Sequence, residues 1–468
     1  MKRKILLLNL PGTVGYNRDM YCSGTTKGDY SWPPIDLLCL SGRLAEKHDV
    51  KVLDALVEKM TAKECLEKVV KMDIDTVIFI TGVASWNEDS AFIKNLKKER
   101  KDISIIGIGG LFLFLGPKLM KENGYINAAI LDFTSADILD YLSGKRGKIK
   151  NIIYRKGNQI IKGDIVPPPG RKFSYPIPKH ELFPIKKYEL PVIRKYPFAN
   201  ILFSMGCVNK CKFCIYGKGT PPYTFRDVEN TIEEMKYLKS LGMRELKFAD
   251  PSISINKPNL KKLCERMIEE KFNFGWYALS RVDEVDEEIL KLMKKAGCHT
   301  LFFGVESGDQ KILNQYAKGI TLERIRKTFK ICKKIGIETC GSFIIGLPGE
   351  TEETVKKTID LALELNCDYA DFAVAAPYVG TALRDEAIAK GWIDKEFKND
   401  IFSDAAQYPI MNIGTIPKER IWELRNKAIR KFHFRPSYLI KRLFRIGSLR
   451  DLNVSAKVGL SFFFNTAK

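Results

Sequence analysis

Three cysteines close together in the chain are the residues best suited to chemistry. Cys207, Cys211 and Cys214 follow an expected strand over residues 199–204 with the spacing C-x3-C-x2-C. Zinc requires a fourth nitrogen or sulfur ligand to complete a tetrahedron, but no histidine lies nearby and the next cysteine is Cys264. A cubane iron–sulfur cluster held by three cysteines instead leaves one iron open to an added ligand. The alternative is three inert buried cysteines, which the polar residues of the loop disfavour.

The elements that must position this loop alternate between strands and helices from residue 199 to residue 395. The expected strands cover residues 199–204, 245–249, 274–279, 300–304, 338–345 and 369–375. The expected helices between them cover residues 227–241, 259–271, 286–295, 322–334 and 351–364. Six strand–helix units are two short of a complete (β/α)8 barrel, so we predict a TIM-like partial (β/α)6 barrel. The cysteine loop would then leave the carboxyl end of a strand, where barrel active sites are built.

Residues 1–145 repeat the same alternation in a first domain. Short aliphatic strands are expected over residues 4–10, 49–54, 76–80, 103–108 and 128–131, with amphipathic helices between them. Such a pattern predicts a doubly wound parallel sheet of the Rossmann-like α/β class, covered on both faces. Ligands of these sheets lie beyond the carboxyl ends of the strands. Thr81-Gly82 and Gly109-Gly110 are expected at such ends.

Two further segments complete the predicted organisation. Residues 146–198 contain a hairpin signal at Gly157-Asn158 and then many prolines, so we interpret them as a connector. Residues 396–468 are expected to form a basic helical region, with helices over 417–434, 437–445 and 454–464.

The cysteine motif has an aromatic residue, Phe213, immediately before its third cysteine and so resembles the signature of the radical S-adenosylmethionine (SAM) superfamily. Further segments are similar to the subgroup with an N-terminal cobalamin-binding domain. They are Trp276, Ser280–Asp283, Ala296–Cys298, Phe303–Ser307, Phe343–Glu350 and Ala376–Thr381. The resemblance implies a 4Fe–4S cluster whose open iron chelates SAM, and reductive cleavage of SAM to a 5′-deoxyadenosyl radical.

The resemblance also implies roles for individual residues around SAM. Phe213 would pack near the adenine, and Arg281 would offer a bidentate fork to the SAM carboxylate. Glu306 would accept hydrogen bonds from the ribose, although an ordinary ion pair is the alternative for both charged residues. The remaining expected cofactor-binding positions are Asp250, Gly304 and Gly346.

Cobalamin is the ligand that the resemblance implies for the first domain. The histidine motif that ligates cobalt in many such domains is absent, because the residues after the second strand, Asp54–Glu58, include no histidine. If cobalamin binds, we therefore expect no histidine on cobalt, with Thr81, Gly82, Gly109 and Gly110 as its candidate contacts. A repurposed domain without cobalamin is the alternative, since fold alone does not establish a ligand.

The charge of the chain suggests its surroundings. The 77 Lys and Arg against 56 Asp and Glu give a formal charge of +21, and residues 418–468 alone hold 13 basic and 3 acidic residues. Basic and apolar residues interleave in this tail, which favours an anionic membrane surface over nucleic acid. No secretion signal or long apolar run is recognised, so we expect a cytoplasmic protein, peripheral at the inner face of the membrane.

The leading functional hypothesis is cobalamin-dependent methylation of a carbon in a lipid-like or natural-product substrate, with flavodoxin or ferredoxin as the reductant. The alternatives are a cobalamin-independent radical rearrangement, cyclisation or carbon–carbon bond formation, and tRNA modification. An iron–sulfur electron carrier is disfavoured, because carriers usually bind all four irons with protein ligands.

Overall fold

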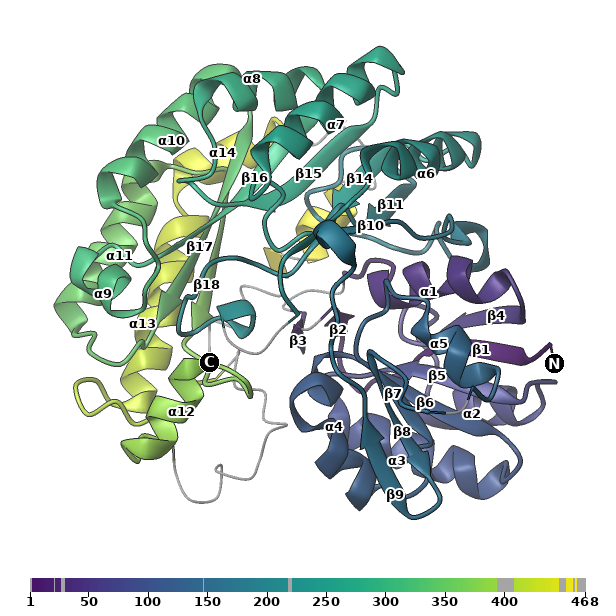
Figure 1. Ribbon diagram of the computed structural model, residues 1–468. Helices are drawn as coiled ribbons and strands as arrows, with labels where there is room; N and C mark the ends of the chain where they lie inside the picture. Colours follow the sequence, from purple (N-terminus) through teal and green to yellow (C-terminus); the bar gives the residue numbers. More distant parts are fainter. Residues whose placement is uncertain are drawn as a thin grey trace. The chain divides into compact units, whose positions relative to one another are not determined.

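The structure is a computed structural model that describes residues 2–20, 22–26, 30–145, 147–217, 221–393, 408–445, 452–457 and 459–460. The described chain forms two compact units, which can be followed by colour along the sequence in Figure 1. The first unit draws its residues from Met1–Thr26, Tyr30–Tyr188 and Thr220–Gly242, and the second from Glu189–Gly219 and Met243–Lys468.

The first unit is built on a seven-stranded sheet in the order β4-β1-β5-β6-β7-β8-β9. Its parallel strands are β1 (Lys4–Asn9), β4 (Asp49–Asp54), β5 (Thr76–Ile80), β6 (Ser104–Ile108) and β7 (Ala128–Ile130). The order and direction confirm the predicted doubly wound α/β sheet. Strand β1 pairs with β4 and β5 in a register that sets Asn9 beside both Asp54 and Ile80, so three strands end at one level.

Helices and two hairpins complete the first unit. The hairpin β8 (Ile152–Lys156) and β9 (Gln159–Lys162) forms as expected and extends the sheet antiparallel beyond β7. A second hairpin, β2 (Tyr16–Asp19) with β3 (Cys22–Thr25), was not expected. The helices are α1 (Ile35–Ala45), α2 (Ala62–Val70), α3 (Trp86–Glu99), α4 (Gly110–Glu122), α5 (Asp137–Leu142) and α6 (Val228–Ser240). The short elements are η1 (Pro169–Arg171), β10 (Lys172–Phe173), η2 (His180–Leu182) and β13 (Thr224–Arg226).

The second unit is built on a six-stranded parallel sheet, here named the second sheet, in the order β11-β14-β15-β16-β17-β18. Its strands are β11 (Phe198–Ile201), β14 (Glu245–Phe248), β15 (Gly275–Ser280), β16 (Cys298–Glu306), β17 (Glu338–Ile345) and β18 (Tyr369–Val374). Each strand pairs with the next one of the sheet in sequence order, as a partial barrel requires. All carboxyl ends of the six strands therefore lie at the same edge.

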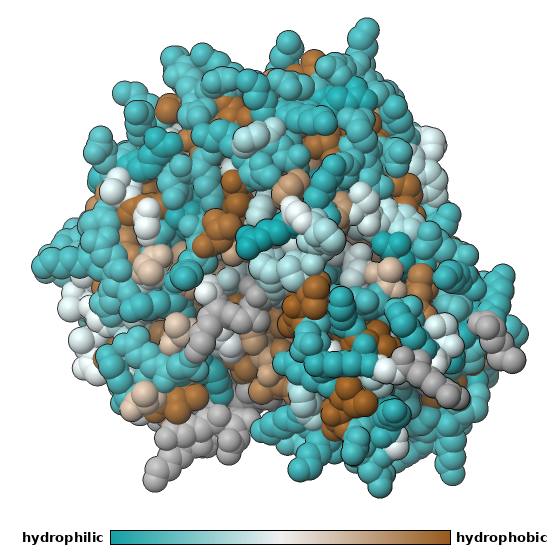
Figure 2. Space-filling view, viewed as in Figure 1, coloured by the Kyte–Doolittle hydropathy of each residue, from teal (hydrophilic) through white to brown (hydrophobic). Residues whose placement is uncertain are grey.

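Helices alternate with these strands and end at recognisable caps. They are α7 (Lys257–Glu269), α8 (Glu287–Lys295), α9 (Gln310–Gln315), α10 (Leu322–Ile335) and α11 (Glu352–Leu365). In α10 the Thr321 side chain caps the first turn, and Gly336 ends the helix in the left-handed conformation with φ 80°. Hydrophilic side chains cover α7, α8 and α10 on the face shown in Figure 2.

The end of the chain adds further helices to the second unit. They are α12 (Ala382–Ala389), α13 (Lys418–His433) and α14 (Pro436–Leu443), and α13 packs against β17 and β18. The expected helix over residues 454–464 lies partly outside the described residues. No helix among the described residues combines the length and hydrophobicity needed to cross a bilayer.

Candidate functional site

The cysteine loop leaves the second sheet after β11, through the short strand β12 (Ser204–Met205). Gly206 follows with φ 79°, a conformation that glycine adopts without strain, and turns the chain into the loop. Backbone hydrogen bonds hold the far side of the loop, from Lys212 N–H to the Tyr316 carbonyl (3.1 Å) and from Leu383 N–H to the Lys212 carbonyl (2.9 Å). The loop ends in the turn η3 (Ile215–Gly217).

The three thiols lie near enough to one another to influence each other's ionisation. Burial raises the pKa of Cys214 to about 12 in the free thiol state, so a bound metal would be needed to hold it as a thiolate at neutral pH. No three His, Cys, Asp or Glu side chains of the described residues converge on one ion position. Each thiolate of a cubane binds a different iron. Three thiolates without a fourth protein ligand are a donor set that fits such a cluster.

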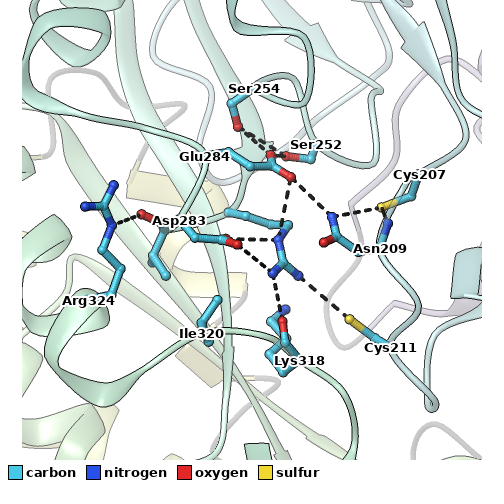
Figure 3. Close-up of polar contacts among 12 residues, drawn as sticks. Cys207, Asn209, Cys211, Ser252, Ser254, Asp283, Glu284, Lys318, Ile320 and Arg324 are labelled. Carbon is cyan, nitrogen blue, oxygen red and sulfur yellow. Dashed lines mark hydrogen bonds and ion pairs between the residues drawn. The ribbon is translucent and has the colours of Figure 1, made fainter. Parts of the chain in front are cut away.

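Arg281, at the carboxyl end of β15, lies against this loop with only 7% of its surface exposed. Its Nε and Nη2 donate to both carboxylate oxygens of Asp283 at 3.0 and 2.9 Å, and Nη2 also donates to the Lys318 carbonyl at 2.7 Å. The remaining nitrogen, Nη1, points to Cys211 Sγ at 3.7 Å. Figure 3 shows Asp283, Lys318 and Cys211 around this point. One edge of the guanidinium is thus held by protein, and Nη1 faces the thiols.

Glu306, at the end of β16, forms a buried ion pair with Lys318, whose Nζ donates to Glu306 Oε1 at 2.7 Å. Burial lowers the pKa of Lys318, but Glu306 outweighs it and raises that pKa above its ordinary value. A Cβ at Gly304 would lie 2.3 Å from Glu306 Oε1 and 2.7 Å from Lys318 Nζ, so glycine makes room for this pair. Glu306 itself has φ 67°, a strained conformation for a glutamate.

Lys318 joins the charged pair to the cysteine loop. Its Nζ lies 6.0 Å from the centre of the Phe213 ring, at the outer limit of a cation–π contact. The same ring lies 6.3 Å from that of Tyr316, whose hydroxyl donates to the Pro348 carbonyl at 2.9 Å. Residues that follow β11, β16 and β17 therefore meet around Phe213.

Asp250, just beyond β14, is fully buried and only partly satisfied. The Phe203 N–H donates to its Oδ2 at 3.1 Å, while Oδ1 has no partner among the described residues. Burial raises its pKa to about 6. A buried carboxylate oxygen without a donor costs free energy, and a bound group that donates to it would relieve that cost.

Glu284 ties the cysteine loop to the strand ends. Its Oε1 accepts a hydrogen bond from Asn209 Nδ2 at 3.2 Å, and Asn209 N–H lies 3.4 Å from Cys207 Sγ. Its Oε2 accepts from Ser254 Oγ at 2.9 Å and also from Ser252. Figure 3 shows these residues in a continuous network from the serines to Cys207.

Glu350 shapes the loop after β17. Its Oε2 accepts hydrogen bonds from the Gly346 and Leu347 N–H groups at 2.7 and 3.0 Å, while Oε1 has no partner among the described residues. Burial raises the pKa of this carboxyl to about 8. Gly346 has φ 89°, and a Cβ there would lie 2.8 Å from Ile421 Cγ2, so the glycine serves a tight turn against α13.

The structure thus brings Phe213, Arg281, Gly304 and Glu306 together with the cysteines, whereas Gly346 contacts α13. Arg281 and Glu306 are not paired with each other, since each has its own protein partner. Sequence reasoning missed Lys318 and Glu284. Glu284 could have been found because it directly follows Asp283 in the motif, but Lys318 lies in a short loop with no recognisable pattern.

The candidate cobalamin contacts in the first unit are all buried. Thr81 Oγ1 donates to Asp89 Oδ2 at 2.7 Å. Gly109 has φ 128°, and a Cβ there would lie 2.0 Å from the Thr81 carbonyl oxygen, so the adjoining loops touch through bare backbone. Gly110 begins α4, and Gly82 follows Thr81. His48 lies at the opposite end of β4, where its Nδ1 accepts from the Arg3 N–H.

Arg18, delivered by the β2–β3 hairpin, fills the same edge of the first sheet. It pairs with Asp89 at 2.7 Å, and both side chains have no exposed surface. Its guanidinium nitrogens also donate to Asn9 Oδ1, Ser85 Oγ and the carbonyls of residues 10 and 11. The cavity left beside Asn9, Arg18 and Asp54 has a volume of only about 10 Å³, room for one water.

A fold with a parallel sheet and a three-cysteine loop at its carboxyl edge defines a class of iron–sulfur enzymes. Residues 201–362 match the radical SAM superfamily. The chain is 33% identical to an uncharacterized methyltransferase of Pyrococcus horikoshii, over 95% of both proteins. The protein belongs to the radical SAM superfamily.

Two solved structures share the fold. The cobalamin-dependent SAM radical enzyme OxsB, with aqua-cobalamin and SAM bound, aligns with a TM-score of 0.73 and 14% identity, over 99% of this chain and 72% of that one. The radical SAM methyltransferase TsrM of Kitasatospora setae, with tryptophan and a SAM analogue bound, aligns with a TM-score of 0.65 and 19% identity, over 84% and 77%. The predicted α/β fold is confirmed.

Family membership establishes the general activity. The protein is a radical SAM enzyme, and its cofactors include SAM and a 4Fe–4S cluster. These parts of the sequence-based prediction are confirmed.

Proposed function

We propose that this enzyme is a cobalamin-dependent methyltransferase that acts on a carbon atom of a lipid-like or natural-product substrate. The observation that supports it most is the arrangement in the second unit, where Arg281 and the Lys318–Glu306 pair lie against the cysteine loop. The full-length similarity to a protein named as a methyltransferase supports the same reaction class.

In this proposal Cys207, Cys211 and Cys214 hold the cluster, and Asn209 donates to Cys207 to orient its sulfur. When bound, the reduced cluster supplies one electron that cleaves SAM to methionine and a 5′-deoxyadenosyl radical. Arg281 Nη1 carries positive charge beside the thiols, where it would stabilise the SAM carboxylate through a charged hydrogen bond. Phe213 offers the adenine an apolar plane, and Glu306 accepts from the ribose hydroxyls.

Asp250 fits the same ligand from the neighbouring strand. Its Oδ1 is buried without a donor among the described residues, so it would accept a hydrogen bond from the amino group of SAM. A positively charged ammonium would also lower the raised pKa of this carboxyl, because an opposite charge favours the ionised form. Asp250 would then hold the amino end of SAM and Arg281 the carboxylate end.

Cobalamin is proposed for the carboxyl edge of the first sheet, where Thr81, Gly82, Gly109 and Gly110 lie. A Cβ at Gly109 would lie 2.0 Å from the Thr81 carbonyl oxygen, so glycine lets the two loops meet through backbone alone. No histidine of the described residues lies there, and His48 is at the opposite end of β4. A cobalamin held here would find no histidine among the described residues to ligate cobalt, and it would supply a transferable methyl group.

The test of the proposed reaction uses SAM with a deuterated methyl group. The anaerobically reconstituted enzyme, with and without hydroxocobalamin, is incubated with extracts of small molecules, and products are compared by mass spectrometry. We expect a product that carries the CD3 group only when cobalamin is present. Formation of 5′-deoxyadenosine with an unlabelled, altered product would instead identify a cobalamin-independent rearrangement or cyclisation.

Cobalamin binding has its own test. Protein purified with added hydroxocobalamin is reduced to the Co(II) form and examined by EPR. We expect retained cobalamin without nitrogen superhyperfine splitting. Splitting by a nitrogen would contradict the proposed ligation, and a protein that retains no cobalamin would favour the cobalamin-independent alternative.

We also propose an acidic reductant of the flavodoxin or ferredoxin type. The cysteine loop exposes Val208, of which 56% is accessible, and the side chains of Lys210 and Lys212, which have no ion-pair partner among the described residues. Complementary charge speeds the association of such partners and makes it sensitive to salt. Reversal of both charges, Lys210→Glu with Lys212→Glu, should slow flavodoxin-driven SAM cleavage but leave dithionite-driven cleavage unchanged. Equal rates with flavodoxin would argue against this contact.

A peripheral contact with an anionic membrane is supported by α14. Its exposed apolar residues continue into the following turn, with Ile440 53%, Leu443 66% and Phe444 88% exposed. An exposed apolar patch at the end of a helix is typical of a segment that lies on a lipid surface. Co-sedimentation with phosphatidylglycerol vesicles should fall when Leu443 and Phe444 are both changed to Ser. Binding that is equal for the variant would contradict the contact.

A further inference from the structure

A cavity of about 260 Å³ lies in the second unit, away from the cysteine loop. The first residues of β17 and β18, Glu338 and Tyr369, line it, together with the segment before β11 and the residues around α14. The amino ends of the strands form this edge, whereas the cysteines follow a carboxyl end. The cavity is therefore separate from the reaction site.

Three arginines line this cavity and only one carboxylate does. Arg194 pairs with Glu338 at 2.7 Å, and Arg445 reaches Glu338 and Asp368 at 2.6 and 2.7 Å. Asp368 is also paired with Lys441. Arg194, Arg445 and Lys441 thus face two carboxylates, and the third arginine, Arg442, adds a further positive charge.

Arg442 has no carboxylate partner among the described residues. Its Nη2 donates weakly to Ser455 Oγ at 3.4 Å, and its guanidinium lies over the Tyr369 ring at 4.9 Å. Stacking on an aromatic ring fixes the plane of a guanidinium without using its donors. Arg442 is therefore positioned but not neutralised.

Arg445 contributes an unused donor to the same place. Its guanidinium lies 5.8 Å from the Tyr369 ring, and its Nη1 is buried without a hydrogen-bond partner among the described residues. A buried guanidinium nitrogen without an acceptor is costly. An anion in the cavity would balance the charge of Arg442 and lie beside this incompletely paired guanidinium.

We propose that this cavity binds a phosphate group. Two guanidinium groups held over one ring suit the several oxygens of a phosphate, because the fork of arginine binds phosphate in bidentate fashion. Val192, Ile193 and Val454 give the cavity an apolar wall, which suits a phosphate ester with an attached carbon chain. The phosphate belongs either to a soluble metabolite or to the headgroup of a phospholipid.

Ligand binding here would join separate parts of the second unit. Arg442 and Ser455 come from the end of the chain, whereas Tyr369 begins β18. A ligand that binds only the folded state raises the melting temperature, and above its Kd the stabilisation grows with the logarithm of its concentration. The site thus predicts stabilisation by phosphate esters independent of SAM cleavage.

The test uses the full reconstituted protein with inorganic phosphate, glycerol 1-phosphate, and vesicles of phosphatidylglycerol or phosphatidylcholine. Calorimetry and thermal melting should show binding of glycerol 1-phosphate that weakens about 10-fold or more in Arg442→Gln. Ser455→Trp, which fills the cavity without a change in charge, should weaken it similarly. Lys431→Gln, an exposed change of the same charge on α13, should not.

The outcomes distinguish the two sources. Binding of soluble phosphates with no preference for phosphatidylglycerol vesicles identifies a metabolite, and vesicle binding lost in Ser455→Trp identifies a headgroup. Absence of any phosphate binding by the unchanged protein overturns the proposal. So does binding that Arg442→Gln reduces but Ser455→Trp leaves intact, because that pattern reflects surface charge alone. SAM cleavage should be unchanged in all variants.

Discussion

The two units differ in how the buried polar groups at the carboxyl edges of their sheets are hydrogen-bonded. In the first unit, Arg18 fills the edge, and its donors are all used by Asp89, Ser85, Asn9 and nearby carbonyls. In the second unit, the edge carries thiols and buried oxygens, and the Asp250 Oδ1 and Glu350 Oε1 atoms have no donor among the described residues. The carboxyl edge of the first sheet, where Arg18 uses all its hydrogen-bond donors, is here named the saturated edge. That of the second sheet, where Asp250 and Glu350 have unpaired oxygens, is named the open edge.

This difference distinguishes buried charges that hold the fold together from buried groups that can bind a ligand. A saturated buried ion pair holds loops in place and gains nothing from a ligand, whereas unsatisfied buried atoms are stabilised when a ligand supplies the missing partner. The second edge is thus suited to bind SAM tightly through side chains. The first edge, where the donors of Arg18 are already used, gains nothing from a further anion.

The largest expected effect tests the saturated edge. Arg18→Met leaves Asp89 buried without its cation, which should destabilise the first unit by about 3–5 kcal/mol. Hydrogen exchange at the amides of β1 and β5 should report the loss locally. Burial already raises the pKa of Asp89, and loss of the cation should raise it further. The variant should therefore be less destabilised at pH 5 than at pH 8, because ionisation of this carboxyl at pH 8 favours the unfolded chain.

Lys145→Met is the matched control, because it removes an exposed pair with Asp140. Exposed pairs contribute about 0–1 kcal/mol, so its effect should be small. If Arg18→Met were as mild as this control, the first edge would not depend on its ion pair, and the contrast between the units would fail.

The next effect concerns SAM binding at the open edge. Arg281→Gln and Glu306→Gln should each raise the KM for SAM about 10-fold or more, since charged hydrogen bonds contribute about 1.5–3 kcal/mol. Lys318→Met should behave like Glu306→Gln, because it leaves Glu306 without its partner. KM is measured from 5′-deoxyadenosine formation with dithionite as reductant.

Arg326→Gln provides the control for this series, since Arg326 pairs with Glu364 at the exposed surface of the same unit. Its KM for SAM should equal that of the unchanged enzyme. Unaltered SAM kinetics in all three site variants would place the cofactor elsewhere and remove the chemical role from this edge.

The smallest effect is a pH dependence from Glu350. Its pKa is about 8 in the folded chain against an ordinary 4.5, so folding favours the protonated form. This contribution to stability is complete below the ordinary pKa and is lost as the pH rises through 8. Glu350→Gln keeps an acceptor for the Gly346 N–H but cannot ionise. The melting temperature of the variant should therefore fall less than that of the unchanged protein between pH 6 and pH 9.

Much of the fold follows from the sequence because strand and helix periods are strong signals. The expected strand over residues 76–80 is β5, and the expected helix over residues 322–334 is α10 with its cap at Thr321. The β2–β3 hairpin was missed because its strands are four residues long and polar. Its importance comes from Arg18, whose carboxylate partner Asp89 lies 71 residues away in sequence.

The site was predictable where a motif fixes spacing and not where folding brings distant residues together. The three cysteines and Arg281 lie in recognisable segments. Lys318 lies in an ordinary loop after α9, and only tertiary structure shows that it reaches Glu306. The expected approach of Gly346 to the cofactor stays a prediction, and the structure adds a second reason for glycine there, the close contact with Ile421 of α13.

The central claim is that Cys207, Cys211 and Cys214 hold one cubane cluster at the open edge. Mössbauer spectra of anaerobically reconstituted protein test it most directly, with Cys65→Ala, which changes a buried thiol of α2, as the control. We predict about four irons in one 4Fe–4S cluster in the unchanged and control proteins, and none after all three cysteines are changed to Ala. A triple variant that retained the full cluster would contradict the account.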